Sequence, residues 1–173
     1  HNLYGELGGN CQVKNSNTIL NAIYKLKDLG YSISEDNIRN GFGNVCGITG
    51  LMGRWQRMEN NPLVICDTGH NIGGIEYIVE QLSSMKYDKL HIVIGMVNDK
   101  DINGVVSRLP QNAIYYFTQA SVRRALDAEK MKEIGAVHNL YGNSYPNVKE
   151  AFSAARNNAG KNDLIFVGGS TFI

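Results

Sequence analysis

Apolar and polar residues form blocks along the chain that predict strands and helices in turn. The apolar run at 63–66 begins just after Pro62 and ends at Asp67. A short apolar run that ends at a charge is typical of a strand buried on both faces of a parallel sheet. Similar runs predict further strands at 90–94, 113–117, 136–140 and 164–167.

Apolar residues spaced three and four apart predict helices between these strands. The predicted helices cover 72–85, 102–109, 125–134 and 148–159. Strands that alternate with helices of this length indicate parallel βαβ units with right-handed crossovers. We therefore expect an α/β fold: a doubly wound, mostly parallel sheet flanked by helices.

The beginning of the chain does not follow this alternation. Its apolar spacing predicts two helices, over 15–29 and 34–41, with no strand between them. We interpret 1–48 as the helical tail of a preceding domain together with a linker, which we place at 43–49. The carboxyl-terminal α/β domain is then expected over 49–173.

A hairpin is predicted next to the first strand of the sheet. The segment 55–59 reads as its antiparallel partner, and the residues between them are typical of turns: Asn60, Asn61 and Pro62. A hairpin of this length would return the chain so that Arg54 lies near Asp67.

Polar residues crowd the segment 67–71, between the first parallel strand and the next helix. Ligands of open α/β sheets collect at the carboxyl ends of strands, where N–H groups of the following helix also point outward. Arg54, Asp67 and His70 are therefore expected to converge on one anionic ligand. The alternative is structural, because an Asp after a strand often only caps a helix and a nearby Arg often only pairs with it.

Other loops at the same predicted edge carry residues that have both a functional and a structural interpretation. Asp99, Lys100 and Asp101 can bind a ligand or cap the following helix. Arg123 and Arg124 suit a carboxylate, although a solvated helix start is equally consistent with them. The glycines before Ser170 allow close approach of a ligand, or they make a turn. The histidines His91 and His138 are interpreted as core or surface residues, and Trp55 as a packing residue.

Composition narrows the function classes. Seventeen basic and sixteen acidic residues leave a net charge of +1, which gives no support to a nucleic-acid or anionic-membrane surface. No apolar run approaches the roughly 20 residues of a membrane span. The three cysteines lack metal-ligand spacing and favour a reduced, cytoplasmic protein, with Cys66 expected to be a small buried hydrophobe. No stretch fits the Gly-rich loop that holds nucleotide phosphates.

Five ordered motifs carry a resemblance to a known family. They are Gln-Val-Lys-Asn at 12–15, Gly-Arg-Trp-Gln at 53–56, Asp-Thr-Gly-His-Asn at 67–71, Gly-Met-Val-Asn-Asp-Lys-Asp at 95–101 and Val-Gly-Gly-Ser-Thr at 167–171. Together they resemble the C-terminal domain of folylpolyglutamate synthase and dihydrofolate synthase, members of the Mur ligase superfamily. One departure is that Thr68 and Gly69 stand where the family usually has Gly and Ala, and both are small enough for the loop to survive.

The resemblance implies an ATP-dependent ligase that adds L-glutamate to folate or dihydropteroate through an acyl phosphate. The residues that it places at the ATP site are Asn15, Arg54, Asp67 and His70. Of these, Arg54 and His70 would also be catalytic. The weaker candidates for binding glutamate are Ser170 and Arg124. No metal ligand is assigned in this chain, because the family holds its Mg²⁺ ligands and its phosphate-binding loop in an N-terminal domain.

The same resemblance makes that N-terminal ATP-binding domain the expected partner and leaves this chain with an incomplete active site. The chain alone is therefore expected to be inactive. Two alternatives stay open: a non-catalytic, flavodoxin-like module that binds a nucleotide or another ligand, and the equivalent domain of a peptidoglycan Mur ligase.

Overall fold

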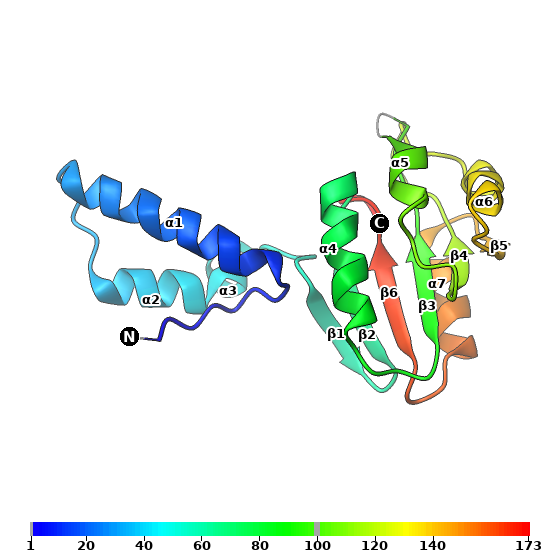
Figure 1. Cartoon of the computed structure of the whole chain (residues 1–173), viewed down its shortest axis with the longest axis horizontal. Coiled ribbons are helices and arrows are strands. Elements are labelled where there is room, and N and C mark those ends of the chain that lie inside the picture. Colours follow the sequence, from blue (N-terminus) through cyan, green and yellow to red (C-terminus); the bar gives the residue numbers. More distant parts are fainter. Residues whose placement is uncertain (1, 99–100) are drawn as a thin grey trace. The chain divides into compact units, whose positions relative to one another are not determined.

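The computed structural model describes residues 2–98 and 101–173, which form two compact units (Figure 1). The first unit ends at Gln56 and the second begins at Arg57. Within its described residues, the first unit holds the helices α1 (Cys11–Asp28), α2 (Glu35–Gly43) and α3 (Val45–Thr49). The assignment of 1–48 to a preceding domain stays a prediction.

The first unit contains both predicted helices, with shifted bounds, and one helix that was not predicted. Helix α2 begins where expected, since the Ser34 side chain accepts the Asn37 N–H and the Asn37 side chain accepts the Ser34 N–H. Helix α1 starts at Cys11, four residues before the predicted start, and ends at Asp28. The segment 43–49 contains helix α3, which ends at Thr49 and is capped by Gly50, where φ is 68°. Its role as a linker stays a prediction.

The second unit is built on a six-stranded sheet, whose strand order is β1-β2-β6-β3-β4-β5. The strands are β1 (Gln56–Asn60), β2 (Leu63–Asp67), β3 (Leu90–Ile94), β4 (Ile114–Phe117), β5 (Gly142–Ser144) and β6 (Leu164–Gly168). All neighbours from β2 to β5 pair in parallel. Strand β1 is antiparallel to β2, because a turn this short cannot join parallel strands. The predicted hairpin and mostly parallel sheet are confirmed.

The order of the strands decides which face each helix covers. The connections through α4 (Ile72–Ser83), α5 (Ile102–Val106) and α6 (Ala128–Val137) all move toward β5, whereas α7 (Val148–Asn158) returns the chain from β5 to β6. Right-handed crossovers therefore place α7 on the face opposite the other three. Figure 1 shows α4 in front of the strands and α7 behind them. The sheet is thus doubly wound, as predicted.

Alternating side chains of the strands fill the core on both faces. On the α7 face, Ala151 and Ala155 pack among buried strand residues, namely Val64, Val93, Tyr116, Ile165 and Val167. On the opposite face, Gly135 of α6 lies against the Phe117 ring so closely that a Cβ there would be 2.6 Å from a ring carbon. All of β3 and β6 is buried, which explains their continuous apolar runs.

Three predicted elements between β3 and β5 need correction. The strand predicted at 136–140 is wrong, because α6 continues to Val137 and Asn139 turns the chain at φ 61° into β5. The helix predicted from 125 begins at Ala128, since Asp127 accepts the N–H groups of Glu129 and Lys130 as the N-cap. The helix predicted over 102–109 ends at Val106.

The close contact of β6 with β2 generates a stability prediction. In Gly168→Ala, the new Cβ would lie 2.5 Å from the backbone oxygen of Asp67 and 2.7 Å from the Phe166 ring. Because the backbone cannot yield cheaply, we expect a loss of about 1–3 kcal/mol in the free energy of unfolding, measured as a lower urea midpoint at unchanged slope.

Gly73→Ala in α4 is the matched control for this prediction, since the nearest atom to its new Cβ is the Asn71 Oδ1 at 3.9 Å. It should keep the stability or raise it by up to about 1 kcal/mol. Equal stabilities of the two variants would contradict the contact.

Candidate functional site

The carboxyl ends of β2, β6 and β3 meet at one edge of the sheet. Gly168 is the register partner of both Asp67 and Ile94, so the loops that follow these three strands start side by side. Gly169 has a φ of 94°, and a Cβ there would be 2.8 Å from the Gly95 oxygen. The glycines therefore let three loops approach more closely than side chains would allow. We call this the carboxyl edge.

The loop after β2 is folded by its own polar groups. The Gly69 N–H donates to the Asp67 Oδ1 at 2.8 Å, and a Cβ on Gly69 would lie 2.5 Å from the Ile78 Cδ1 of α4. The N-cap of α4 is Asn71, whose side chain accepts the Gly74 N–H at 2.8 Å. The structural alternative for Asp67 as a helix cap is therefore wrong, because Asn71 has that role.

His70 has a defined tautomer when it is neutral. Its Nδ1 lies 3.0 Å from the Thr68 backbone oxygen. A carbonyl oxygen can only accept a hydrogen bond, so Nδ1 carries the proton and Nε2 presents a lone pair. The side chain is only half-buried. His70 is thus suited to accept a proton or a hydrogen bond from a ligand.

The two predicted glutamate-binding residues share a neighbourhood. Ser170 is buried, and its Oγ accepts the Phe172 N–H at 3.2 Å. The Arg124 guanidinium carbon lies 5.0 Å from the centre of the Phe172 ring, in cation–π geometry. Arg124 does not begin a helix, since α6 starts only at Ala128. That part of its structural alternative is therefore wrong.

Arg54 and Asn15 belong to the first unit, so the predicted convergence of Arg54 with Asp67 and His70 stays a prediction. Arg54 is exposed and stands between Gly53, with φ 69°, and Trp55, with φ 48°. The Gln56 side chain accepts the Gly53 N–H at 2.9 Å, which fixes this turn. Asn15 is exposed on α1 and donates to the Gln12 side chain at 3.1 Å.

Two further residues near the carboxyl edge are Asp101, which the sequence analysis named, and Thr118, which it did not. Asp101 caps α5 through the Gly104 N–H, as its structural alternative expected, whereas residues 99–100 lie outside the described residues. Thr118, fully buried at the end of β4, was missed. Among the described residues its Oγ1 has no hydrogen-bond partner. A buried hydroxyl leaves no periodic signal in a sequence.

Cys66 lies in β2, next to Asp67. Cys66 is half-buried rather than buried. The pKa of its thiol is raised, mainly by desolvation and to a smaller extent by the negative charge of Asp67.

In the described part of the chain, no group of three or more His, Cys, Asp or Glu residues is placed to hold a metal ion. None of the helices there is both long and apolar enough to pass through a bilayer.

Comparisons with known proteins agree with the fold and with the motifs. The chain is 32% identical over 151 residues to the dihydrofolate synthase/folylpolyglutamate synthase of Escherichia coli (strain K12). That match covers 86% of this chain and 34% of the relative. The chain therefore spans about a third of the length of this relative.

Two solved structures have the same fold over most of this chain. The structure of E. coli FolC in complex with DHPP and ADP has a TM-score of 0.71 at 30% identity. It matches 86% of this chain and 34% of its own. The bifunctional folylpolyglutamate synthase/dihydrofolate synthase with Mn, AMPPNP and L-glutamate bound also has a TM-score of 0.71, at 28% identity over 86% of this chain and 35% of its own.

A family model supplies the assignment. The model described as "Mur ligase, glutamate ligase domain" matches residues 53–171, which include every strand from β2 to β6 and all of the carboxyl edge. A match of this extent shows the family. The chain belongs to the Mur ligase family through its glutamate ligase domain.

Proposed function

We propose that this chain is the carboxyl-terminal part of an ATP-dependent ligase that adds L-glutamate to folate or dihydropteroate through an acyl phosphate. The observation that carries the proposal is the 30% identity and common fold with FolC over 86% of the chain. The names of the relatives favour the folate branch over a peptidoglycan Mur ligase.

The ATP site that we propose uses Asn15, Arg54, Asp67 and His70. Phosphoryl transfer depends mainly on positioning and on charge stabilisation. An exposed guanidinium such as that of Arg54 matches phosphate oxygens with its planar fork. The Asp67 carboxylate, oriented by the Gly69 N–H, is suited to accept from ribose hydroxyls. The Mg²⁺ that accompanies ATP would be held mainly by residues outside this chain.

The glutamate site that we propose lies near Ser170 and Arg124. Glutamate brings carboxylates, which a guanidinium binds bidentately. The cation–π contact with Phe172 supports the Arg124 side chain, and the Phe172 N–H in turn bonds to Ser170. One short segment therefore connects both candidates.

His70 has a chemical role in this proposal. The amine of glutamate must lose a proton before or while it attacks the acyl phosphate. With Nδ1 donating to Thr68, the Nε2 of a neutral His70 is an acceptor for such a proton. This role requires His70 to face the substrate, which is part of the proposal.

The preceding ATP-binding domain is the partner that the first unit favours. Helix α1 has no buried residue, although it carries apolar side chains such as Ile19 and Ile23. Within the same unit, these line an apolar groove of about 430 Å³ together with Ile38 and Phe42. Apolar surface of this kind is typical of a contact with another domain. Closure of the two domains would exclude water from the acyl phosphate. We place the enzyme in the cytoplasm.

The proposal predicts that the 173-residue chain alone neither hydrolyses ATP nor ligates glutamate. Joined to the remaining amino-terminal part of the E. coli relative, it should support ATP-dependent addition of glutamate. The assay measures ADP release and the glutamylated product. We call this fusion the hybrid ligase.

Two results would contradict the proposal. Glutamate addition by the unaided chain would show that the active site is complete. A soluble hybrid ligase that binds ATP but glutamylates neither folate nor dihydropteroate would remove the function. Tight binding of FMN or NAD by the chain alone, measured by calorimetry, would favour the binding-module alternative.

In the hybrid ligase, Arg54→Ala should lower kcat/KM at least tenfold, the effect of losing one charge-assisted contact of about 1.4 kcal/mol. Arg57→Ala is the matched control, because Arg57 is an exposed arginine three residues away in β1. It should keep the full activity. Equal activities of the two variants would take Arg54 out of the site.

A further inference from the structure

The segment 2–8 runs beside α2 and α3 and is hydrogen-bonded to both helices (Figure 1). We call this segment the strap. The Arg39 side chain of α2 donates to the Asn2 oxygen at 3.2 Å, and the Glu6 N–H donates to a backbone oxygen of α2 at 2.9 Å. The Glu6 carboxylate in turn accepts the N–H of Cys46 in α3 at 2.8 Å. The strap is thus fixed to two helices of the first unit.

At Gly8 the strap lies directly against Trp55, which is the only tryptophan in the sequence. A Cβ on Gly8 would be 3.2 Å from the Trp55 backbone oxygen and 3.2 Å from the ring carbon Cδ1. Both distances are shorter than an ordinary van der Waals contact, so a larger side chain at this position would have to displace Trp55. Because Gly8 has no side chain, the strap touches the main chain and the ring of Trp55 together.

Trp55 needs support from its surroundings because its backbone is left-handed, with a φ of 48°. This conformation is uncommon for any residue other than glycine, is an outlier for a bulky one, and persists where neighbouring structure holds it. Without that support Trp55 would return to a negative φ, a rotation of roughly 100° about its N–Cα bond. The rotation would swing the preceding peptide, and Arg54 with it.

The other neighbour of Arg54 is also held in place. Gly53 is buried, has a φ of 69° and donates its N–H to the Gln56 side chain at 2.9 Å. The exposed Arg54 therefore stands between two residues with left-handed backbones, and its direction depends on both. The Gln56 side chain fixes the residue before Arg54, whereas the strap fixes the residue after it.

From these contacts we propose that Trp55 is a positioning residue for Arg54, and that the strap, through Gly8, keeps Trp55 in its left-handed conformation. This inference rests on the proposed function, in which the Arg54 guanidinium binds phosphates of ATP. A guanidinium binds phosphate as a planar fork, so the strength of the contact depends on its direction as well as on its charge. A misplacement of about 1 Å can lower activity on the order of a hundredfold. Trp55 itself does not touch the nucleotide and acts through Arg54.

The first test measures the contact between the strap and Trp55 in the full 173-residue chain. Because Trp55 is the only tryptophan, its fluorescence reports on this contact alone. Gly8→Val should shift the emission maximum to longer wavelength and increase quenching by acrylamide, since the displaced ring loses the cover of the strap.

Gly5→Val is the matched control, because it places the same side chain in the same strap. Among the described residues, no atom beyond its chain neighbours lies within 4 Å of a Cβ built on Gly5. Its emission and quenching should equal those of the parent chain. Identical spectra for Gly8→Val and Gly5→Val would contradict the contact.

The second test measures the consequence for catalysis in the hybrid ligase. Gly8→Val should raise the KM for ATP by up to about tenfold, the effect of weakening one charge-assisted contact. The KM for glutamate should stay unchanged, whereas a general loss of folded enzyme would lower kcat and alter neither KM. Trp55→Ala should have the same effect, and it keeps the test available if Gly8→Val does not fold. Trp55→Phe retains a ring against the strap and should keep the parent KM.

A double-mutant cycle shows whether the strap acts through Arg54. Gly8→Val should have no further effect in a hybrid ligase that already carries Arg54→Ala, because coupled residues are not additive. If Arg54→Ala lowers activity and Gly8→Val adds its own loss to it, the positioning role is overturned and the proposed ATP site stands. The same holds if Arg54→Ala lowers activity while Gly8→Val and Trp55→Ala leave the KM for ATP unchanged. Full activity of Arg54→Ala would remove the proposed ATP contact, and the positioning role with it.

Discussion

The contact between the ends of β2 and β6 is the constraint on which the candidate site depends. It brings the backbone of Asp67 against Gly168, where no side chain fits. The loop with Asp67 and His70 and the loop with Ser170 thereby leave the sheet side by side. Because both strands are internal to the parallel sheet, their hydrogen bonds hold these loops to a fixed register. In this chain, the arrangement of strands positions polar residues on short loops.

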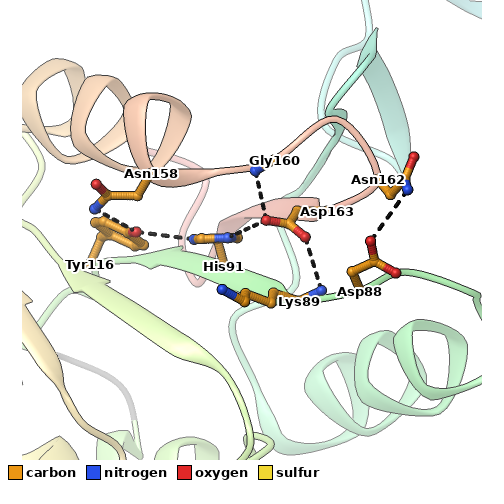
Figure 2. Close-up of polar contacts among 8 residues, drawn as sticks. All are labelled: Asp88, Lys89, His91, Tyr116, Asn158, Gly160, Asn162 and Asp163. Carbon is orange, nitrogen blue, oxygen red and sulfur yellow. Dashed lines mark hydrogen bonds and ion pairs between the residues drawn. The ribbon is translucent and has the colours of Figure 1, made fainter.

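The two ends of the sheet meet opposite physical demands. At the carboxyl edge, Asp67 and His70 are half-buried, and the Nε2 of a neutral His70 is a hydrogen-bond acceptor. At the amino end, His91 and Asp163 are buried. The two ring nitrogens of His91 have hydrogen-bond partners there, in the Tyr116 hydroxyl and the Asp163 carboxylate (Figure 2). Polar groups that bind ligands must stay accessible, whereas buried polar groups need internal partners. Strand β6 connects the two ends, since Asp163 precedes it and Ser170 follows it.

The sequence predicted those parts of the structure that depend on neighbours along the chain. The strand at 90–94 was predicted to the residue, because a strand buried on both faces is a continuous apolar run. The Ser34 cap and the hairpin before β2 were predicted from local turn and cap chemistry. The strand at 136–140 was wrong and the helix at 45–49 was not predicted, because short apolar runs and glycines fit more than one structure.

Contacts between distant residues could not be predicted in this way. His91 was interpreted as a core residue, but its partners are 25 and 72 positions away and leave no pattern around it. The Arg124 contact with Phe172 is equally remote in sequence. For the candidate site, the motifs indicated the loops that follow β2 and β6, whereas the proton on His70 and the cap at Asn71 required coordinates.

The central claim is that ligands bind at the carboxyl edge, and amide NMR of the hybrid ligase labelled only in this chain tests it most directly. Addition of AMPPNP with Mg²⁺ and then of L-glutamate should shift the amide signals of 68–71 and 169–172 and leave those of 159–163 unchanged. Shifts confined to 159–163, at the amino end of the sheet, would contradict the account.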